Sequence, residues 1–109
     1  DRREVIKILK KIKNGKIIFI APEGTRNPNK GLLDFKDGGF FISLKTKVNI
    51  VPMIIQGADS IIKKGSWKIN SGLIKIKIMP EVDVDKYNKL DNSLEELKKD
   101  IRNIFERNI

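Results

Sequence analysis

The sequence of 109 residues contains no cysteine and no histidine, and only one tryptophan and one tyrosine. Without cysteine there are no disulfides and no thiolate metal sites, as is typical of proteins of a reducing compartment. Without histidine the chain lacks the commonest general base and the commonest metal ligand. Single Trp67 and Tyr87 residues argue against a surface that stacks nucleic-acid bases. No apolar stretch is long enough to span a bilayer, and the first residues do not resemble a signal peptide.

What the chain has in excess is positive charge, with 23 Lys and Arg against 14 Asp and Glu and a net charge of +9. This balance is found in proteins that bind nucleic acid, anionic membrane surfaces or anionic small molecules. It also arises where the whole composition is rich in Lys, Ile and Asn, as it is here. The lysines are scattered and form no block of like charge, so the pattern predicts a generally basic surface rather than a dedicated nucleic-acid patch.

Three segments have the apolar spacing of amphipathic helices. The first is expected from Asp1 to about Asn14, the second over 35–45, and the third from Ser93 onward. Capping boxes, with a carboxylate three residues after the N-cap, open the first and third helices. The residues expected to face the core are Val5, Ile8, Leu9 and Ile12 in the first helix, Phe40, Phe41 and Leu44 in the second, and Leu94, Leu97, Ile101 and Ile104 in the third.

Three further segments are expected to be strands, over 16–21, 48–55 and 73–79. The first is apolar on both faces, which is typical of a strand covered on two sides. In the second, Pro52 predicts a bulge or a sheet edge, because proline has no N–H to donate. Strands that alternate with helices predict an α/β fold, with a mostly parallel or mixed sheet and flanking helices. Three helices barely cover such strands, so we expect residues 1–109 to be a single partial domain, the C-terminal part of a larger one.

The most informative motif is the turn Glu23-Gly24-Thr25-Arg26, which follows the apolar run and is opened by Pro22. Ligands of α/β proteins usually bind where strands end. Gly24 allows a ligand to approach the backbone, and Arg26 offers a planar fork of donors that matches phosphate or carboxylate. The alternative is an ordinary turn, since Pro and Gly mark turns for local reasons. Arg26 is the one arginine outside the predicted helices, which favours the phosphate interpretation.

Four segments in this order resemble blocks of the glycerophospholipid acyltransferase family, which includes the lysophosphatidate (1-acyl-glycerol-3-phosphate) acyltransferases. Asp1-Arg2 is similar to the end of the family's second block, and 22–26 is similar to its third. Phe35-Lys36-Asp37-Gly38 resembles the Phe-Lys-x-Gly segment that follows, and Ile50-Val51-Pro52-Met53 resembles the fourth block. The resemblance runs from Asp1 to about Gly57, with looser agreement to Pro80.

The resemblance implies transfer of a fatty acyl group from acyl-CoA or acyl-carrier protein to the hydroxyl of 1-acyl-glycerol-3-phosphate in phospholipid biosynthesis. It implies no further cofactor and no metal. In the family, the histidine of a His-x-x-x-x-Asp block is the general base, so we expect the base upstream of residue 1 and expect this chain alone to be inactive. Residues 1–57 would carry the acceptor-binding blocks, and 58–109 a C-terminal strand and helix.

The resemblance also implies roles for individual residues of the turn. Arg26 would be the phosphate fork, Gly24 would admit the phosphate, and Thr25 would present a hydroxyl beside them. Glu23 would hold the turn or the arginine in place. Ala21 and Asn27 stand where the family usually has an aromatic residue and a serine, and both changes leave the phosphate chemistry intact.

Three residues outside the turn have an implied role and an ordinary alternative. Arg2 and Lys36 are further candidates for contacting the phosphate, and the alternative for each is a solvated surface residue. Pro52 would shape the acyl-donor side, and its alternative is a simple strand irregularity.

The expected partners are a lysophospholipid or glycerol phosphate acceptor, the acyl donor and an anionic membrane surface. The predicted location is cytoplasmic, peripheral at the inner face of the cell membrane. Two alternatives stay open: a non-catalytic basic module that binds phospholipid or nucleic acid, and a relative that binds phospholipid without turning it over. Nucleic-acid binding would fall steeply with salt.

Overall fold

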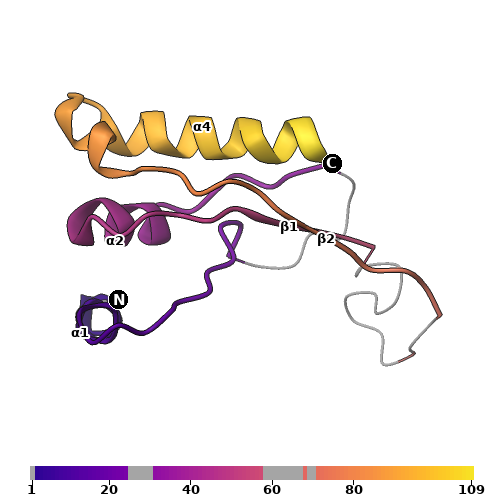
Figure 1. Cartoon of the computed structure of the whole chain (residues 1–109), viewed down its shortest axis with the longest axis horizontal. Helices are drawn as coiled ribbons and strands as arrows, with labels where there is room; N and C mark the ends of the chain where they lie inside the picture. The colour runs from indigo at the N-terminus through magenta and orange to yellow at the C-terminus, as the bar shows by residue number, and fades with distance from the viewer. Residues whose placement is uncertain (1, 25–30, 58–67, 69–70) are drawn as a thin grey trace.

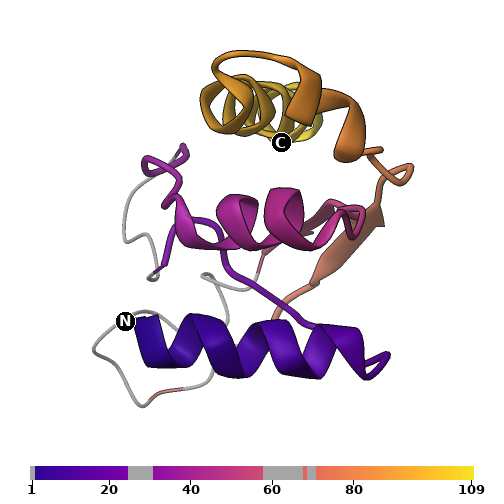
Figure 2. The same ribbon diagram turned by 90° about the vertical axis from the view of Figure 1, so that its left-hand side faces the viewer.

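The computed structural model describes residues 2–24, 31–57, 68 and 71–109. In this part of the chain, helix α2 (Gly38–Thr46) lies between α1 (Arg2–Lys13) and α4 (Ser93–Asn108), as Figures 1 and 2 show. A two-stranded sheet of β1 (Met53–Gln56) and β2 (Lys75–Ile78) extends to one side. Short helix η1 (Asp85–Lys89) packs against α2 and α4. Helices packed with a sheet give the predicted α/β class, in which the described strands form one antiparallel pair.

Helix α1 ends as its sequence predicts, whereas its predicted N-cap, Asp1, lies outside the described residues. Its apolar residues recur every three to four positions and its last turn is basic, which suits the negative end of the helix dipole. Gly15 has a positive φ of 79°, and the N–H of Lys16 donates to the carbonyl of Lys11 at 3.1 Å. A left-handed glycine with this bond closes a helix by satisfying its last carbonyls.

Helix α2 begins later than predicted, at Gly38 rather than Phe35. Phe35 instead lies in an extended segment, where the N–H of Lys36 donates to the carbonyl of Pro22 at 2.7 Å. The inward face was also predicted wrongly in part, because Phe41 is 47% exposed while Ile42 is buried. The helix is apolar nearly all round, so its sequence does not define one buried stripe.

The predicted strand over 16–21 is wrong for the described structure, which assigns no strand there. Ile17 is 84% exposed and Phe19 is 82% exposed. A strand persists through hydrogen bonds to a neighbouring strand, and no described strand pairs with this segment. The apolar side chains of this segment are therefore left largely uncovered by the described residues.

Pro52 interrupts strand pairing, as its lack of an N–H predicts. Met53 pairs with Ile78, and an isolated bridge joins Ile50 to Val82. Between these two pairs, the two residues 51–52 thus oppose the three residues 79–81, which is a β-bulge with its extra residue on the segment facing Pro52. The carbonyl of Pro52 still accepts the N–H of Met79 at 2.9 Å.

The core lies between α2, η1 and α4. The third predicted helix is confirmed, with Leu97 0% and Ile101 2% exposed and Leu94 and Ile104 packed at the margin. The predicted capping box is not formed as expected, because the N-cap is Asn92, whose side-chain amide donates to Glu96 at 3.2 Å. The other members of the core are Phe35, Phe40, Leu44, Val84 and Tyr87.

Tyr87 joins the core to α4, because its hydroxyl donates a hydrogen bond to the carboxylate of Asp100. Burial and this hydrogen bond raise the pKa of Tyr87 to about 12. Both effects favour the neutral phenol in the folded state. The stabilisation is therefore complete below the ordinary tyrosine pKa of about 10 and is lost as the pH rises from there towards about 12.

Because Tyr87 is the only tyrosine, a pH titration of tyrosinate absorbance reports on this side chain alone. We expect a midpoint at about pH 12 in the folded chain, and a midpoint near the ordinary value in strong denaturant. In the Asp100→Asn variant the midpoint should fall only part of the way, since burial is the larger cause. Equal midpoints for folded and unfolded chain would show that Tyr87 is solvated.

Candidate functional site

The turn Pro22-Glu23-Gly24 is held against the segment 32–36. It is called the acceptor turn here after the role that the sequence resemblance implies for it. The carbonyl of Pro22 accepts the N–H of Lys36 at 2.7 Å. Oε2 of the half-buried Glu23 accepts the N–H of Leu33 at 2.9 Å. Side-chain carboxylates that accept backbone N–H groups form strong, charge-assisted hydrogen bonds. Glu23 thus ties the turn to a segment ten positions further along the chain.

Gly24 supplies a backbone conformation that few other residues adopt. Its φ is 74°, and its N–H closes the turn onto the carbonyl of Ala21 at 3.0 Å. A Cβ built at this position would lie 3.2 Å from Cγ of Lys36. The stem of Lys36 therefore passes directly beside Gly24, and a side chain here would be both strained and crowded.

The structure brings together Glu23, Gly24 and Lys36 among the predicted site residues. Thr25 and Arg26 lie outside the described residues. Arg2 begins α1, and its side chain lies outside the described part of the molecule. The ammonium-bearing side chain of Lys36 is exposed, and its backbone N–H has the structural task of bonding to Pro22.

A cavity of about 610 Å³ opens between α1, segment 16–22, α2 and segment 48–53. Pro52 is buried and borders this cavity together with Ile50 and Met53. Lys36, Gly39 and Pro22 border it as well, so the cavity reaches the acceptor turn. Its lining is mainly apolar, which suits a hydrocarbon chain better than a polar ligand.

Sequence reasoning missed the residues of α4 that reach this site. Both terminal nitrogens of Arg102 donate to backbone carbonyls, Nη1 to Leu33 at 2.7 Å and Nη2 to Leu32 at 3.1 Å. Lys98 pairs with Asp37 at 2.8 Å, and this hydrogen bond raises the pKa of Lys98. Arg102 and Leu33 are 69 positions apart, so no local pattern could have signalled the contact.

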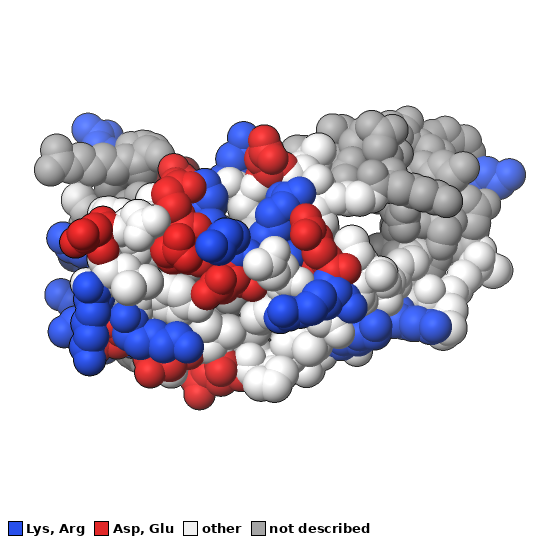
Figure 3. Space-filling model, turned by 90° about the horizontal axis from the view of Figure 1, so that it is seen from above, with Lys and Arg blue, Asp and Glu red and all other residues white. Residues whose placement is uncertain are grey.

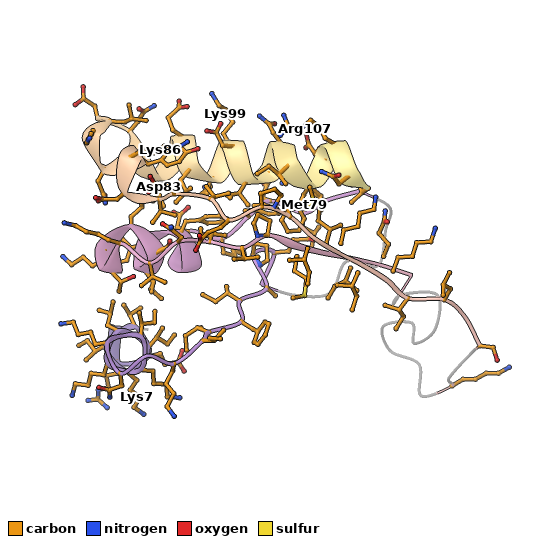
Figure 4. All side chains as sticks on the ribbon, in the orientation of Figure 1. Lys7, Met79, Asp83, Lys86, Lys99 and Arg107 are labelled. Carbon is orange, nitrogen blue, oxygen red and sulfur yellow. The ribbon has the colours of Figure 1, made fainter. Side chains whose placement is uncertain are left out.

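A second hollow of about 670 Å³ lies between segment 79–83, η1 and α4. Figure 4 shows Met79, Asp83 and Lys86 along the segment that runs from β2 into η1. The hollow is lined by Asp83 and Asp100 as well as Lys86 and Arg107. Because both acidic and basic side chains line this hollow, it favours neither an anionic nor a cationic ligand.

Charge on the described surface is mixed over α4 and basic over α1. In Figure 3, Lys and Arg alternate with Asp and Glu over the α4 side of the molecule. Lys7 lies on the side of α1 away from α2 in Figure 4, and α1 ends in Lys10, Lys11 and Lys13. None of the described helices is long and apolar enough to cross a membrane. Nor do the described carboxylates gather into a group that could hold a metal ion.

Comparison with known proteins gives consistent similarities. The sequence model of the family described as Acyltransferase matches residues 1–56. The 1-acyl-sn-glycerol-3-phosphate acyltransferase of Salmonella typhimurium is 34% identical over 92 residues, which are 84% of this chain and 36% of that protein. The protein of the same name from Limnanthes alba is 29% identical over 107 residues, covering 98% of this chain and 37% of that protein.

A solved structure agrees with these sequence similarities. The crystal structure of the 1-acyl-sn-glycerophosphate (LPA) acyltransferase PlsC from Thermotoga maritima matches with a TM-score of 0.83 and 35% identity. The match covers 94% of this chain and 41% of that one. The chain thus spans well under half the length of the proteins it resembles.

Proposed function

Because this chain belongs to the acyltransferase family, we propose that it forms part of an enzyme that acylates 1-acyl-glycerol-3-phosphate in phospholipid biosynthesis. The acyl group would come from a thioester, acyl-CoA or acyl-carrier protein, and no other cofactor is assigned. The 109 residues contain no histidine. The general base that takes the proton of the acceptor hydroxyl is therefore assigned to another part of the acyltransferase domain.

The observation that carries the proposal is the acceptor turn. Two hydrogen bonds, from Lys36 to Pro22 and from Leu33 to Glu23, fix a turn that leads directly into Thr25 and Arg26. Phosphate binding by an arginine fork requires a backbone held in place, because the geometry of two parallel donors is strict. Gly24, which has no side chain of its own, leaves room beside this turn for the stem of Lys36.

The acceptor's phosphate is assigned to Arg26, with Thr25 and Gly24 beside it. Lys36 is a second cation for the phosphate, since its stem passes beside Gly24. Arg2 is a further candidate for the phosphate. The acyl chain is assigned to the apolar cavity that begins at this turn, with Pro52 and Met53 on its donor side. Phosphate and hydrocarbon would thus bind at adjoining places, as a lysophospholipid requires.

A peripheral position at the cytoplasmic face of an anionic membrane accords with the net charge of +9. The exposed Lys7, Lys10, Lys11 and Lys13 of α1 give one place where this charge is concentrated. Each basic residue close to anionic lipid contributes about 1 kcal/mol of attraction. Such attraction would hold the enzyme where its lipid substrates are.

The test is an acyl-transfer assay on the complete enzyme that contains this chain. With acyl-CoA or acyl-carrier protein as donor and lysophosphatidate as acceptor, it should form phosphatidate, detected by mass spectrometry. The matched control is 1-monoacylglycerol, which has the same hydrocarbon and the same secondary hydroxyl but a free primary hydroxyl in place of the phosphate. Absence of phosphatidate with both donors, or equal acylation of the two acceptors, would contradict the proposal.

A further inference from the structure

Arg102 of α4 is the best-connected cation in the described structure near the acceptor turn. Its two terminal nitrogens hold the carbonyls of Leu33 and Leu32, as given above, and its Nε donates to Glu106 at 3.1 Å. Its guanidinium also lies 5.4 Å from the ring centre of the buried Phe35. Glu106 and the Phe35 ring fix the plane of the guanidinium, so that its two terminal nitrogens both point at the backbone of Leu32 and Leu33.

Leu33 connects this arginine to the acceptor turn. Its carbonyl accepts from Arg102, while its N–H donates to Glu23. The hydrogen-bonded series thus runs from Glu106 through Arg102 and Leu33 to Glu23. A shift of Leu33 would lengthen one bond or the other, so the two ends of the series are coupled through one residue.

Helix α4 holds the far end of the same segment by a second contact. Lys98 pairs with Asp37, which precedes α2. Segment 32–37 is therefore held to α4 near both ends, and the N–H of Lys36 in this segment bonds to Pro22. The helix lies outside residues 1–56, the part that the family model matches.

We propose that Arg102 is a positioning residue for acceptor binding, which fixes Leu33 and thereby the carboxylate of Glu23 and the acceptor turn. This inference rests on the proposed function. A lysine could not replace Arg102, because an ammonium cannot donate to two adjacent carbonyls and a carboxylate in one plane. Arg102 contacts backbone rather than substrate, so its loss should change acceptor affinity and leave the chemical step nearly unaffected.

The experiment compares Arg102→Gln and Arg102→Lys in the complete enzyme, with Arg107→Gln as the control. Arg107 is exposed on the same helix and its loss changes the net charge equally. For both Arg102 variants we expect KM for lysophosphatidate to rise about five- to tenfold, with kcat and KM for the acyl donor within about twofold of wild type. Arg107→Gln should match wild type in all three constants.

A double-mutant cycle with Glu23→Ala tests the coupling. Since both side chains act on Leu33, the combined variant should raise the acceptor KM by less than the product of the single effects. Hydrogen exchange of the Leu33 amide gives a readout without turnover, and should quicken in Arg102→Gln but not in Arg107→Gln.

The outcomes separate this inference from the proposed function. If wild-type enzyme makes no phosphatidate, the proposed function fails and this inference fails with it. If wild type is active and Arg102→Gln has an unchanged acceptor KM, the inference alone is overturned. A parallel rise in KM for donor and acceptor together with a lower melting temperature would also overturn it, because that pattern indicates a purely structural role.

Discussion

Replacing Arg26 by alanine in the complete enzyme should lower kcat/KM for lysophosphatidate by roughly 30-fold to several thousand-fold. In the proposed site, Arg26 pairs with the acceptor phosphate. Truncating one partner of a hydrogen-bonded charge pair that is buried on binding costs about 2–5 kcal/mol, and each factor of ten in rate corresponds to about 1.4 kcal/mol. The loss is expected mainly in acceptor KM, because in the proposed reaction the phosphate would be bound both before and during acyl transfer. Steady-state kinetics with varied lysophosphatidate at saturating acyl donor measure the effect.

The Arg26→Lys variant distinguishes the contribution of the positive charge from that of the two parallel donors of the guanidinium. A lysine keeps the positive charge but donates as a single point, so this variant should recover only part of the lost acceptor affinity. The acyl donor supplies the internal control, because its KM should stay at the wild-type value in both variants. Wild-type kinetics for Arg26→Ala would remove Arg26 from the acceptor site.

The parts of the fold that the sequence predicted well are those set by short-range patterns. Helices α1 and α4 have polar residues on one side, apolar residues on the other, and clear end signals such as Gly15. Pro52 also predicted the interruption of strand pairing, because a residue without an N–H interrupts the hydrogen-bond ladder of any sheet. In each of these cases the deciding interaction lies within a few residues.

The predictions that failed depend on neighbours that the local sequence does not specify. The apolar run 16–21 was expected to be a buried strand, yet Ile17 and Phe19 are exposed in the described structure. In α2, Phe41 and Ile42 are adjacent and both apolar, yet Phe41 is 47% exposed and Ile42 is buried, and nothing in their own sequence distinguishes them. Hydrophobicity indicates that a side chain needs cover but not what covers it.

The candidate site divides in the same way. Glu23, Gly24 and Lys36 were singled out from a motif and meet in the structure, where Leu33 accounts for the orientation of Glu23. Arg102 was missed, because an arginine on an amphipathic helix has the same sequence pattern whether it is solvated or bonded to a distant carbonyl. Its assignment required the packing of α4 across segment 32–37.

That packing depends on Leu97, and Leu97→Ala should lower the free energy of unfolding by about 2–5 kcal/mol. Leu97 is fully buried in the core that α4 shares with α2 and η1, so truncation leaves a cavity that the rigid surroundings fill only in part. Small domains have a total stability of about 5–15 kcal/mol, so the loss is a large fraction of the whole. Urea unfolding followed by circular dichroism measures it.

Leu94→Ala is the matched control, since it removes the same atoms from the same helix at the margin of the core. The sequence pattern gives the two leucines equal weight, whereas their burial predicts a clearly smaller loss for Leu94. Equal losses would mean that α4 is not seated on the core as described. In that case Arg102 would not be held near Leu33 either, so the stability of this helix and the geometry of the acceptor turn depend on the same contact surface.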